Sequence, residues 1–143
     1  MLRSAGTDAG VLPDATELRS ACWLAAFVGE TMVGVAGVET MVDAAAMRWL
    51  VVAESSRGCG IGAALVGAAR KAAHTRGARR LYALCARGSP YLEHFGFERV
   101  PAAEMLDDLA GTTVADYLRA RPDELARTAA LLLDISRDGI IER

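Results

Sequence analysis

The chain has 143 residues, a formal net charge of −2 and a hydrophobic content of 52%. This length predicts one domain with a sizeable core, and the slightly acidic balance argues against a nucleic-acid-binding domain, which is usually strongly basic. The sequence contains no uninterrupted apolar run of about 18 residues, so no membrane span is expected. The three cysteines lack metal-site spacing, and residues 1–13 lack the apolar segment of a signal peptide, so we expect a cytoplasmic protein.

The first elements expected along the chain are three β-strands. Apolar segments at 23–29 and 32–39 flank a turn at residues 29–30 and predict a β-hairpin. After a further turn, the apolar run at 46–53 predicts a buried third strand.

An amphipathic helix is expected next, over residues 65–76, with Gly77 as the residue that ends it. A strand is expected at 81–85. A short helix then begins at Pro90, with Ser89 as its N-cap, because proline is favoured at the first helical position and serine at the cap.

Short elements fill the rest of the chain. Gly111 separates two helices, and Thr112 or Thr113 is expected to cap the second. These helices are expected at 102–109 and 114–120, and the remaining strands at 97–100 and 129–135.

A glycine-rich loop stands between the third strand and the long helix, with the sequence Arg57-Gly58-Cys59-Gly60-Ile61-Gly62. A strand, a glycine loop and a helix start form an anion-binding device, because the first helical turn has unpaired N–H groups and a positive dipole end. Glycines also let a phosphate approach the backbone without meeting a Cβ atom. The pattern predicts a phosphate-bearing ligand, and a plain tight turn is the alternative.

Two well-known phosphate loops do not fit this stretch. A Walker A loop requires Gly-Lys-Ser/Thr where residues 61–63 read Ile-Gly-Ala. The Rossmann pattern G-x-G-x-x-G/A is formally matched by Gly58, Gly60 and Ala63. However, several residues separate the strand from the first glycine, and the next strand ends without the required acid.

A third loop fits better, and through it the chain resembles the GNAT superfamily of N-acetyltransferases. Arg57, Gly60 and Gly62 match the family's acetyl-CoA signature Arg/Gln-x-x-Gly-x-Gly/Ala. The strand ending at 50–52 reads Leu-Val-Val where the family has Leu-Ala-Val, and residues 90–97 resemble the family's short helix ending in Gly-Phe. Within the family, the chain looks most like small bacterial amino-acid N-acetyltransferases.

The resemblance covers about residues 23–100 and implies the fold. The GNAT fold is of the α/β (α+β) class, with a central mixed, mostly antiparallel sheet, a splayed parallel strand pair and helices on both faces. We therefore expect a single domain over 1–143, with a cofactor-binding core at about 44–97. The family's N-terminal strand and helix are expected to be short or missing, because only residues 1–22 precede the first clear strand.

The resemblance also implies acetyl-CoA as cofactor, CoA as product and no metal. The exposed backbone of Leu50, Val51 and Val52 would bind the pantetheine arm, because edge N–H and C=O groups need partners. Arg57 would add charge beside the pyrophosphate. The alternative interpretation of Arg57 is a solvated loop arginine without a ligand. The N–H groups that would hold the pyrophosphate belong to Gly58, Cys59, Gly60, Ile61, Gly62 and Ala63.

Two residues are candidates for proton transfer. Glu39 is the predicted general base, because a charge at the end of an apolar strand is costly without a task or a partner; the alternative is an exposed strand end. Many relatives protonate the CoA thiolate with a tyrosine four residues before the glycine of Gly-Phe, and that position is Leu92 here. The adjacent Tyr91 is the candidate acid, but it is rotated by about 100° on the helix, so packing is its alternative role.

Two arginines are candidates for substrate binding. Arg48 lies in an otherwise apolar strand and would bind a substrate carboxylate in a bidentate way. Its alternative is a salt bridge to Glu39 or Asp43. Arg87, in the loop after the next strand, is the second candidate.

These residues predict an enzyme that moves an acetyl group from acetyl-CoA directly to a primary amine of a small molecule, such as an amino acid or related carboxylate. Direct attack is expected because no nucleophile–base pair is evident. The alternative is a non-catalytic acyl-CoA-binding or regulatory domain. The expected partners are a small-molecule amine and a second copy of the chain, since a missing strand would leave an exposed sheet edge; no nucleic acid or membrane is expected.

Overall fold

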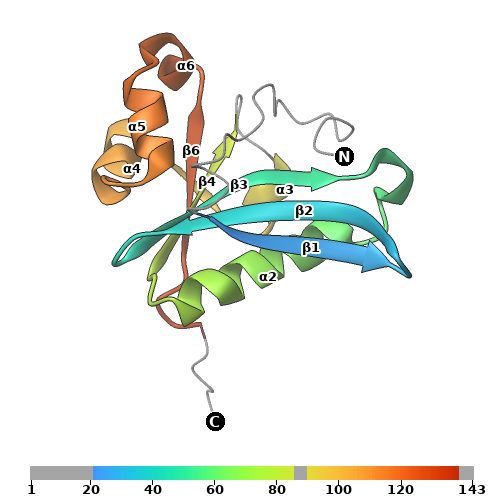
Figure 1. Ribbon diagram of the computed structural model, residues 1–143. Helices are drawn as coiled ribbons and strands as arrows, with labels where there is room; N and C mark the ends of the chain where they lie inside the picture. The colour runs from blue at the N-terminus through green and yellow to red at the C-terminus, as the bar shows by residue number, and fades with distance from the viewer. Residues whose placement is uncertain (1–20, 86–89, 139–143) are drawn as a thin grey trace.

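The computed structural model describes residues 21–85 and 90–138 (Figure 1). The strands are β1 (Cys22–Val28), β2 (Thr31–Thr40), β3 (Ala44–Val52), β4 (Arg80–Cys85), β5 (Glu98–Val100) and β6 (Ala129–Asp134). The helices are η1 (Glu54–Ser56, a 3₁₀ turn), α2 (Ile61–Thr75), α3 (Pro90–His94), α4 (Ala102–Asp108), α5 (Thr113–Arg119) and α6 (Pro122–Ala126). The expectations for the N-terminal strand and helix and for the Ser89 cap lie outside the described residues.

The strands of the described residues form one six-stranded sheet in the order β1-β2-β3-β4-β6-β5. Every neighbouring pair is antiparallel except β3 and β4, which run parallel. The mixed, mostly antiparallel sheet with one parallel pair is therefore confirmed. The last strand, β6, enters between β4 and β5.

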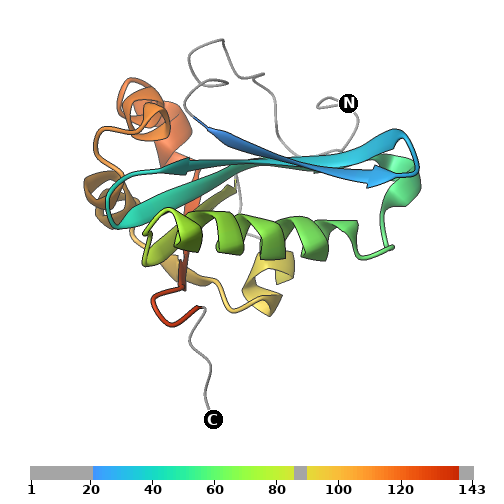
Figure 2. The ribbon, with the colours of Figure 1, turned by 60° about the horizontal axis from the view of Figure 1, so that its bottom comes forward.

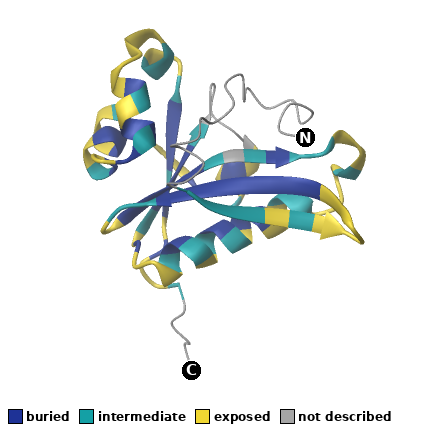
Figure 3. Ribbon diagram, in the orientation of Figure 1, coloured by how far each residue is buried: buried dark blue, intermediate teal, exposed yellow. Residues whose placement is uncertain are grey.

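Helices cover both faces of this sheet (Figure 2). The alternation along β4 shows the two faces: Leu81 and Ala83 pack in the core cluster with α2 and α3, and Tyr82 packs in the cluster with α4 and α5. Burial is continuous along most of β2, whereas the end of β1 that leads into the β1–β2 turn is exposed (Figure 3).

Helix α2 is amphipathic, and its buried stripe consists of Leu65, Val66, Ala69 and Ala73. It starts at Ile61, four residues before the predicted start at 65, because the glycines of its first turn obscure the helical pattern. The predicted C-terminal glycine is confirmed: Gly77 has φ +93°, and the Ala78 N–H donates to Ala73 O at 3.0 Å, as in a Schellman motif. No described helix is both long and apolar enough to cross a membrane.

The starts of helices α5 and α6 have local sequence signals. The side chain of Thr112 accepts a hydrogen bond from the Ala115 N–H at 3.2 Å, so the first of the two predicted caps of α5 is confirmed. The sequence interpretation missed α6, which is only five residues long. It starts with Pro122 and has Asp123 and Glu124 in its first turn, both favourable at a helix N-terminus.

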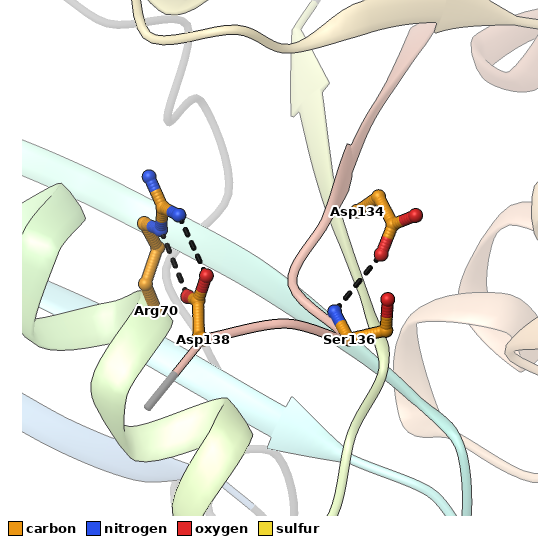
Figure 4. Close-up of polar contacts among 4 residues, drawn as sticks. All are labelled: Arg70, Asp134, Ser136 and Asp138. Atoms are coloured by element: carbon orange, nitrogen blue, oxygen red, sulfur yellow. Dashed lines mark hydrogen bonds and ion pairs between the residues drawn. The ribbon is translucent and has the colours of Figure 1, made fainter. Parts of the chain in front are cut away.

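The segment after β6 is tied to α2 by a bidentate ion pair (Figure 4). Arg70 donates from Nε and one terminal nitrogen to the carboxylate of Asp138 at 3.1 and 2.8 Å. Just before it, the Ser136 N–H donates to Asp134 Oδ1 at 2.9 Å, which fixes the turn. These contacts hold residues 136–138 against the helix that follows the glycine loop.

Candidate functional site

The two parallel strands separate part-way along their length. Backbone pairing joins Ala44–Met47 of β3 to Arg80–Ala83 of β4 and then stops. Strand β3 continues over residues 48–52, still paired with β2 on its other side. The edge of 48–52 that faces β4 has no strand partner within the described part of the chain. We call this segment the open edge, and the last parallel pair, Met47 with Ala83, the apex.

A β-bulge explains why the strands diverge. On the β2 side, Val35 pairs with Val51, but Gly37 pairs with Arg48. One more residue of β3 than of β2 lies between these pairs, and such an insertion bends and twists the strand. The bend starts next to the apex, so β3 turns away from β4. An open edge of this kind suits an extended ligand with amide groups, because its backbone N–H and C=O groups require partners.

The glycine loop follows the open edge through η1. Gly58 and Gly60 both have φ +80°, a left-handed conformation that other residues adopt only with strain. A Cβ atom on either glycine would meet no atom within 4 Å. Backbone conformation therefore explains both glycines, and the space above them is open.

The first turn of α2 is free of a side-chain cap. Gly60 is the N-cap and supplies no side-chain hydrogen bond. The N–H groups of residues 61–63 have no intrahelical acceptor, and the helix dipole makes this end positive. The uncapped turn and the open space above the glycines fit the pyrophosphate group that the sequence predicted here.

Arg57 links the open edge to the loop. Its Nε donates to the carbonyl oxygen of Val52 at 3.4 Å, and its side chain is exposed. This contact holds a guanidinium group beside the uncapped turn, where the predicted charge is needed. The three predicted strand residues differ in burial: Val51 is fully buried, whereas Leu50 and Val52 are half-buried. Their predicted contact with a cofactor would therefore be made mainly by backbone atoms.

The loop lies at the end of the open edge that is farthest from the apex. A Cβ atom on Gly34, which pairs with Val52, would lie 3.0 Å from Ile61 Cγ2 and 2.9 Å from Leu65 Cδ1. The first turns of α2 therefore pack at the level of Val52. Arg48 is at the opposite end of the open edge, next to the apex.

Glu39 is buried and holds helix α5. Only 7% of the residue is exposed, and its carboxylate accepts hydrogen bonds from the Thr113 N–H and Oγ1 at 3.0 and 2.8 Å. It also accepts from the Val114 N–H at 3.3 Å. The alternative of an exposed strand end is therefore wrong. Glu39 lies opposite Ala46, one residue before the apex, so its predicted role as general base stays a prediction beside its observed role as a cap.

The two neighbours on α3 point in different directions, as the helical rotation predicted. Leu92, at the family's tyrosine position, is buried with 5% exposure. Tyr91 is 48% exposed, and its ring makes an edge contact with Phe95 at 5.0 Å between centroids. The Tyr91 hydroxyl lies against Gly62: a Cβ atom there would be 2.5 Å from Tyr91 Oη. The structure therefore brings Tyr91 to the glycine loop.

Arg48 lies on the face of the sheet that carries α5. Its guanidinium carbon is 5.8 Å from the ring centroid of Tyr117. Because Arg48 pairs with Gly37 and Glu39 pairs with Ala46, Arg48 and Glu39 are diagonal neighbours on one face. The structure thus brings these two predicted residues together next to the apex. The second predicted arginine, Arg87, lies outside the described residues.

Sequence reasoning missed the aromatic neighbour of Arg48. The Arg121 guanidinium carbon lies 3.8 Å from the ring centroid of Tyr117, whose hydroxyl donates to Glu124 Oε2 at 2.9 Å. Burial, together with the bond to Glu124, raises the pKa of Tyr117 above its ordinary value. Tyr117 and Arg121 are four residues apart, and this spacing was the available sequence signal for their contact. The contact with Arg48 comes from a distant strand and leaves no local pattern.

A second polar group that the sequence did not indicate joins β4 to α4. Tyr82 is fully buried and donates to Asp108 Oδ2 at 2.7 Å, and Arg80 donates to Asp108 Oδ1 at 2.8 Å. The hydrogen bond from Arg80 lowers the pKa of Asp108, and burial raises the pKa of Tyr82. This group lies at the paired end of β4 and contributes to the fold rather than to the open edge.

Comparison with solved structures supports the fold. The structure of Rv2747 from Mycobacterium tuberculosis, in complex with CoA, matches with a TM-score of 0.65 at 20% identity, covering 78% of this chain and 75% of that chain. N-acetylglutamate synthase from Neisseria gonorrhoeae, complexed with coenzyme A and N-acetyl-glutamate, matches with a TM-score of 0.67 at 19% identity. That match covers 84% of this chain but only 26% of the synthase chain.

A GNAT family acetyltransferase from Elizabethkingia anophelis with acetyl-CoA bound matches with a TM-score of 0.62 at 15% identity, covering 83% of this chain and 79% of that chain. No curated protein sequence matches this chain significantly. The model of the acetyltransferase (GNAT) family matches residues 5–97, which is more than half of the chain. The chain therefore belongs to the GNAT family of acetyltransferases, and acetyl-CoA is its cofactor.

Proposed function

We propose that this protein is an N-acetyltransferase that moves the acetyl group of acetyl-CoA directly to a primary amine of a small molecule, such as an amino acid or a related carboxylate. The observation that carries the proposal is the open edge of β3, which ends at an uncapped helix turn. An extended amide arm fits the open edge, and a pyrophosphate fits the uncapped turn.

Each part of the site has a binding task in this proposal. The backbone of residues 48–52 holds the amide groups of the pantetheine arm, and the N–H groups of the glycine loop hold the pyrophosphate. Arg57, fixed by its bond to Val52, adds positive charge at the phosphate end. The cofactor supplies an acetyl thioester near the apex, where the acceptor amine must be placed.

Direct transfer is favoured over a covalent acyl-enzyme. Of the two cysteines whose side chains the structure describes, Cys22 is on β1, two strands from the open edge, and Cys59 is exposed in the glycine loop at the phosphate end. The third, Cys85, ends β4 two residues beyond Ala83, and no nucleophile–base pair is evident in the sequence. The protein's task is therefore to hold the amine in line with the thioester and to remove a proton from it.

Glu39 is proposed to receive that proton through a bridging water. Its carboxylate is on the strand next to the apex and is held in place by Thr113 and Val114. A fixed orientation is useful in a base, but each donor from α5 also competes for the oxygen atoms. A Glu39 substitution is therefore the direct test of this role.

Arg48 is proposed to bind a carboxylate of the acceptor. It is next to the apex, on the face that carries Glu39 and Tyr117. A guanidinium group there can hold a carboxylate while the amine of the same molecule reaches the thioester. N-acetyl-glutamate, with which the similar N-acetylglutamate synthase is complexed, is an acetylated amino acid, which supports an amino-acid acceptor here.

A non-catalytic acyl-CoA-binding domain is the second candidate. One observation favours it: Leu92 is buried in the core at the position where many relatives have the tyrosine that protonates the thiolate. However, a thiol with a pKa of about 8.5 is an adequate leaving group without an acid. The presence or absence of turnover separates the two candidates.

The first experiment measures CoA release from acetyl-CoA in the presence of a panel of amino acids, with mass spectrometry of the acetylated amine. Amine-dependent release supports the proposal. Binding of acetyl-CoA without release for any amine would favour the second candidate. If acetyl-CoA neither binds nor reacts, the assignment of the cofactor site is overturned.

Two glycine variants form a test of the cofactor loop and its control. Gly60→Val places a β-branched residue at φ +80° and should abolish cofactor binding, because the loop cannot keep its conformation. Gly67→Ala changes an exposed glycine of the same helix with open space around it, and should leave binding unchanged while stabilising the helix by about 0.5–1 kcal/mol.

The predicted cytoplasmic location and homodimer remain proposals. Strand β1 is the outer strand on one side of the described sheet, and Phe27 and Val28 near its end are each 60% exposed. Light scattering across a range of protein concentrations would test the dimer.

A further inference from the structure

Gly62 differs from the other glycines of the loop. Gly58 and Gly60 are explained by their left-handed backbone, but Gly62 is the second residue of α2 and has no positive φ. A side chain at Gly62 would meet the hydroxyl end of Tyr91. A Cβ atom there would lie 2.5 Å from Tyr91 Oη and 3.3 Å from Tyr91 Cζ. Glycine at this position therefore makes room for Tyr91.

The ring of Tyr91 is held at its edge while about half of the residue stays exposed. Phe95, one helical turn further along, contacts the ring edge-on at an interplanar angle of 76°. Leu92 anchors the same short helix in the core with 5% exposure. Tyr91 itself remains 48% exposed. These contacts place a hydroxyl donor beside the N–H groups of the first turn of α2.

The position of this hydroxyl does not suit protonation of the CoA thiolate. The first turns of α2 are at the level of Val52, and the apex is next to Arg48. Four strand residues at a rise of about 3.3 Å separate these levels by about 13 Å. A ligand with its pyrophosphate on the helix turn and its arm along the open edge places its sulfur toward the apex. Tyr91 is therefore beside the phosphate end.

We infer that Tyr91 is a cofactor-binding residue whose hydroxyl donates a hydrogen bond to a phosphate oxygen of acetyl-CoA, and that Gly62 is required to seat it there. The inference rests on the proposed function only through the cofactor. It replaces the predicted role of Tyr91 as general acid. A hydroxyl next to the three N–H groups adds one more neutral donor to an anion site that Arg57 already makes positive.

The first test is Tyr91→Phe, which keeps the ring and its contact with Phe95. Loss of a hydrogen bond to a charged group should raise the KM for acetyl-CoA and the Kd for CoA about tenfold, with kcat at saturation unchanged. With S-acetyl-pantetheine, which lacks the pyrophosphate, the variant and the wild type should be indistinguishable. A fall in kcat at unchanged KM, or an equal loss with both donors, would overturn the inference.

The second test measures the contact itself and needs no turnover. Gly62→Ala should lower the Tm and weaken CoA binding, because the methyl group displaces Tyr91. In a Tyr91→Ala background the same change should be neutral or stabilising, since the ring is gone. Additive effects in this double-mutant cycle would show that Gly62 and Tyr91 are not in contact.

These readouts separate the inference from the proposed function. If no amine is acetylated but Tyr91→Phe weakens CoA binding in calorimetry, the proposed function fails and the inference holds. If amines are acetylated and Tyr91→Phe leaves both the KM and the Kd unchanged, the inference fails alone. Absence of CoA binding to the wild type would overturn both.

Discussion

Glu39 shows how a single carboxylate can have two tasks, and variants can separate them. Both of its oxygens accept hydrogen bonds from the start of α5. Glu39→Ala should destabilise the protein by about 1–3 kcal/mol, because it removes the cap and leaves buried donors unpaired. Glu39→Gln keeps one acceptor oxygen, so its Tm should fall less. Thermal unfolding of both variants checks this order.

The catalytic task of Glu39 is tested by the glutamine variant alone. A general base contributes about 10²–10⁴-fold, so kcat should fall by at least about 10² in Glu39→Gln, and the acidic limb of the pH–rate profile should disappear. The matched control is Glu30→Gln, an exposed residue of the β1–β2 turn, which should change neither property. If Glu39→Gln retained its kcat but had a lowered Tm, the role of Glu39 would be limited to holding the start of α5.

Arg48 is predicted to select acceptors that carry a carboxylate. Arg48→Gln should raise the KM for an amino-acid acceptor at least about tenfold, because a charge-assisted pair is lost, and should leave the KM for acetyl-CoA unchanged. The corresponding amino-acid amide should be used equally by both proteins. The control is Arg99→Gln, an exposed residue of β5. Equal losses for the acid and the amide would show that Arg48 supports the fold rather than the acceptor.

At the scale of elements, the Asp108 group ties strand β4 to helix α4. Arg80 and Tyr82 both donate to its carboxylate, and the side chain of Asp108 is only 22% exposed. The pKa of Asp108 is lowered chiefly by the bond from Arg80. A depressed carboxyl pKa stabilises the folded state above the unfolded pKa of about 3.9, and this stability is lost as the pH falls through the folded-state pKa.

The expected result is a pH-dependent loss of stability. Asp108→Asn should lower the free energy of unfolding by about 1–2 kcal/mol at pH 7, and the difference from the wild type should shrink below about pH 4. Its neighbour Asp107 has an 86% exposed side chain that lies 3.7 Å from Arg119, so Asp107→Asn is the matched control with an expected effect under about 0.5 kcal/mol. Urea unfolding at several pH values distinguishes the two variants. A difference that persists unchanged at low pH would contradict the linkage.

Most of these elements could be predicted from local patterns, and the exceptions have physical reasons. The strands alternate or are continuously apolar, and Gly77 and Thr112 mark helix ends by their own conformations or side chains. Helix α6 was missed because it is short and buries no residue. The start of α2 was placed too late because the glycines at its N-cap and in its first turn obscure the helical pattern.

The site was predictable only in part, for a similar reason. The anion loop is local in sequence, so its residues and the class of its ligand follow from the glycine spacing and the helix behind it. The contacts of Glu39 with Thr113 and of Gly62 with Tyr91 join residues far apart in the chain. Such pairs depend on how the elements are arranged in space, which local patterns do not reveal. Strand order is an example, because β6 lies between β4 and β5 in the sheet although it comes last in the sequence.

At the scale of the whole molecule, the sheet consists of two halves with a narrow junction. Strands β1, β2 and β3 form one antiparallel half, and β4, β6 and β5 form the other. Within the described residues, strand pairing joins the halves where Ala44–Met47 pairs with Arg80–Ala83, and the Arg79 N–H donates to the Asp43 carbonyl just before it at 2.7 Å. A ligand between the diverging strands contacts the open edge of β3 and the first turn of α2. Because it binds only the folded arrangement of these elements, binding should stabilise the folded molecule as a whole.

Acetyl-CoA at about 100 times its Kd should therefore stabilise the protein by about 2.7 kcal/mol, a shift of a few degrees in Tm, and NADP should not. Hydrogen exchange localises the effect: amides within 48–52 and 58–63 should exchange more slowly with the ligand, because they donate to it, while β5 should be unchanged. Gly60→Val should abolish both responses, and Gly67→Ala should retain them. Protection confined to α5 and α6 would place the ligand on the opposite face of the sheet and remove the basis for the cofactor site.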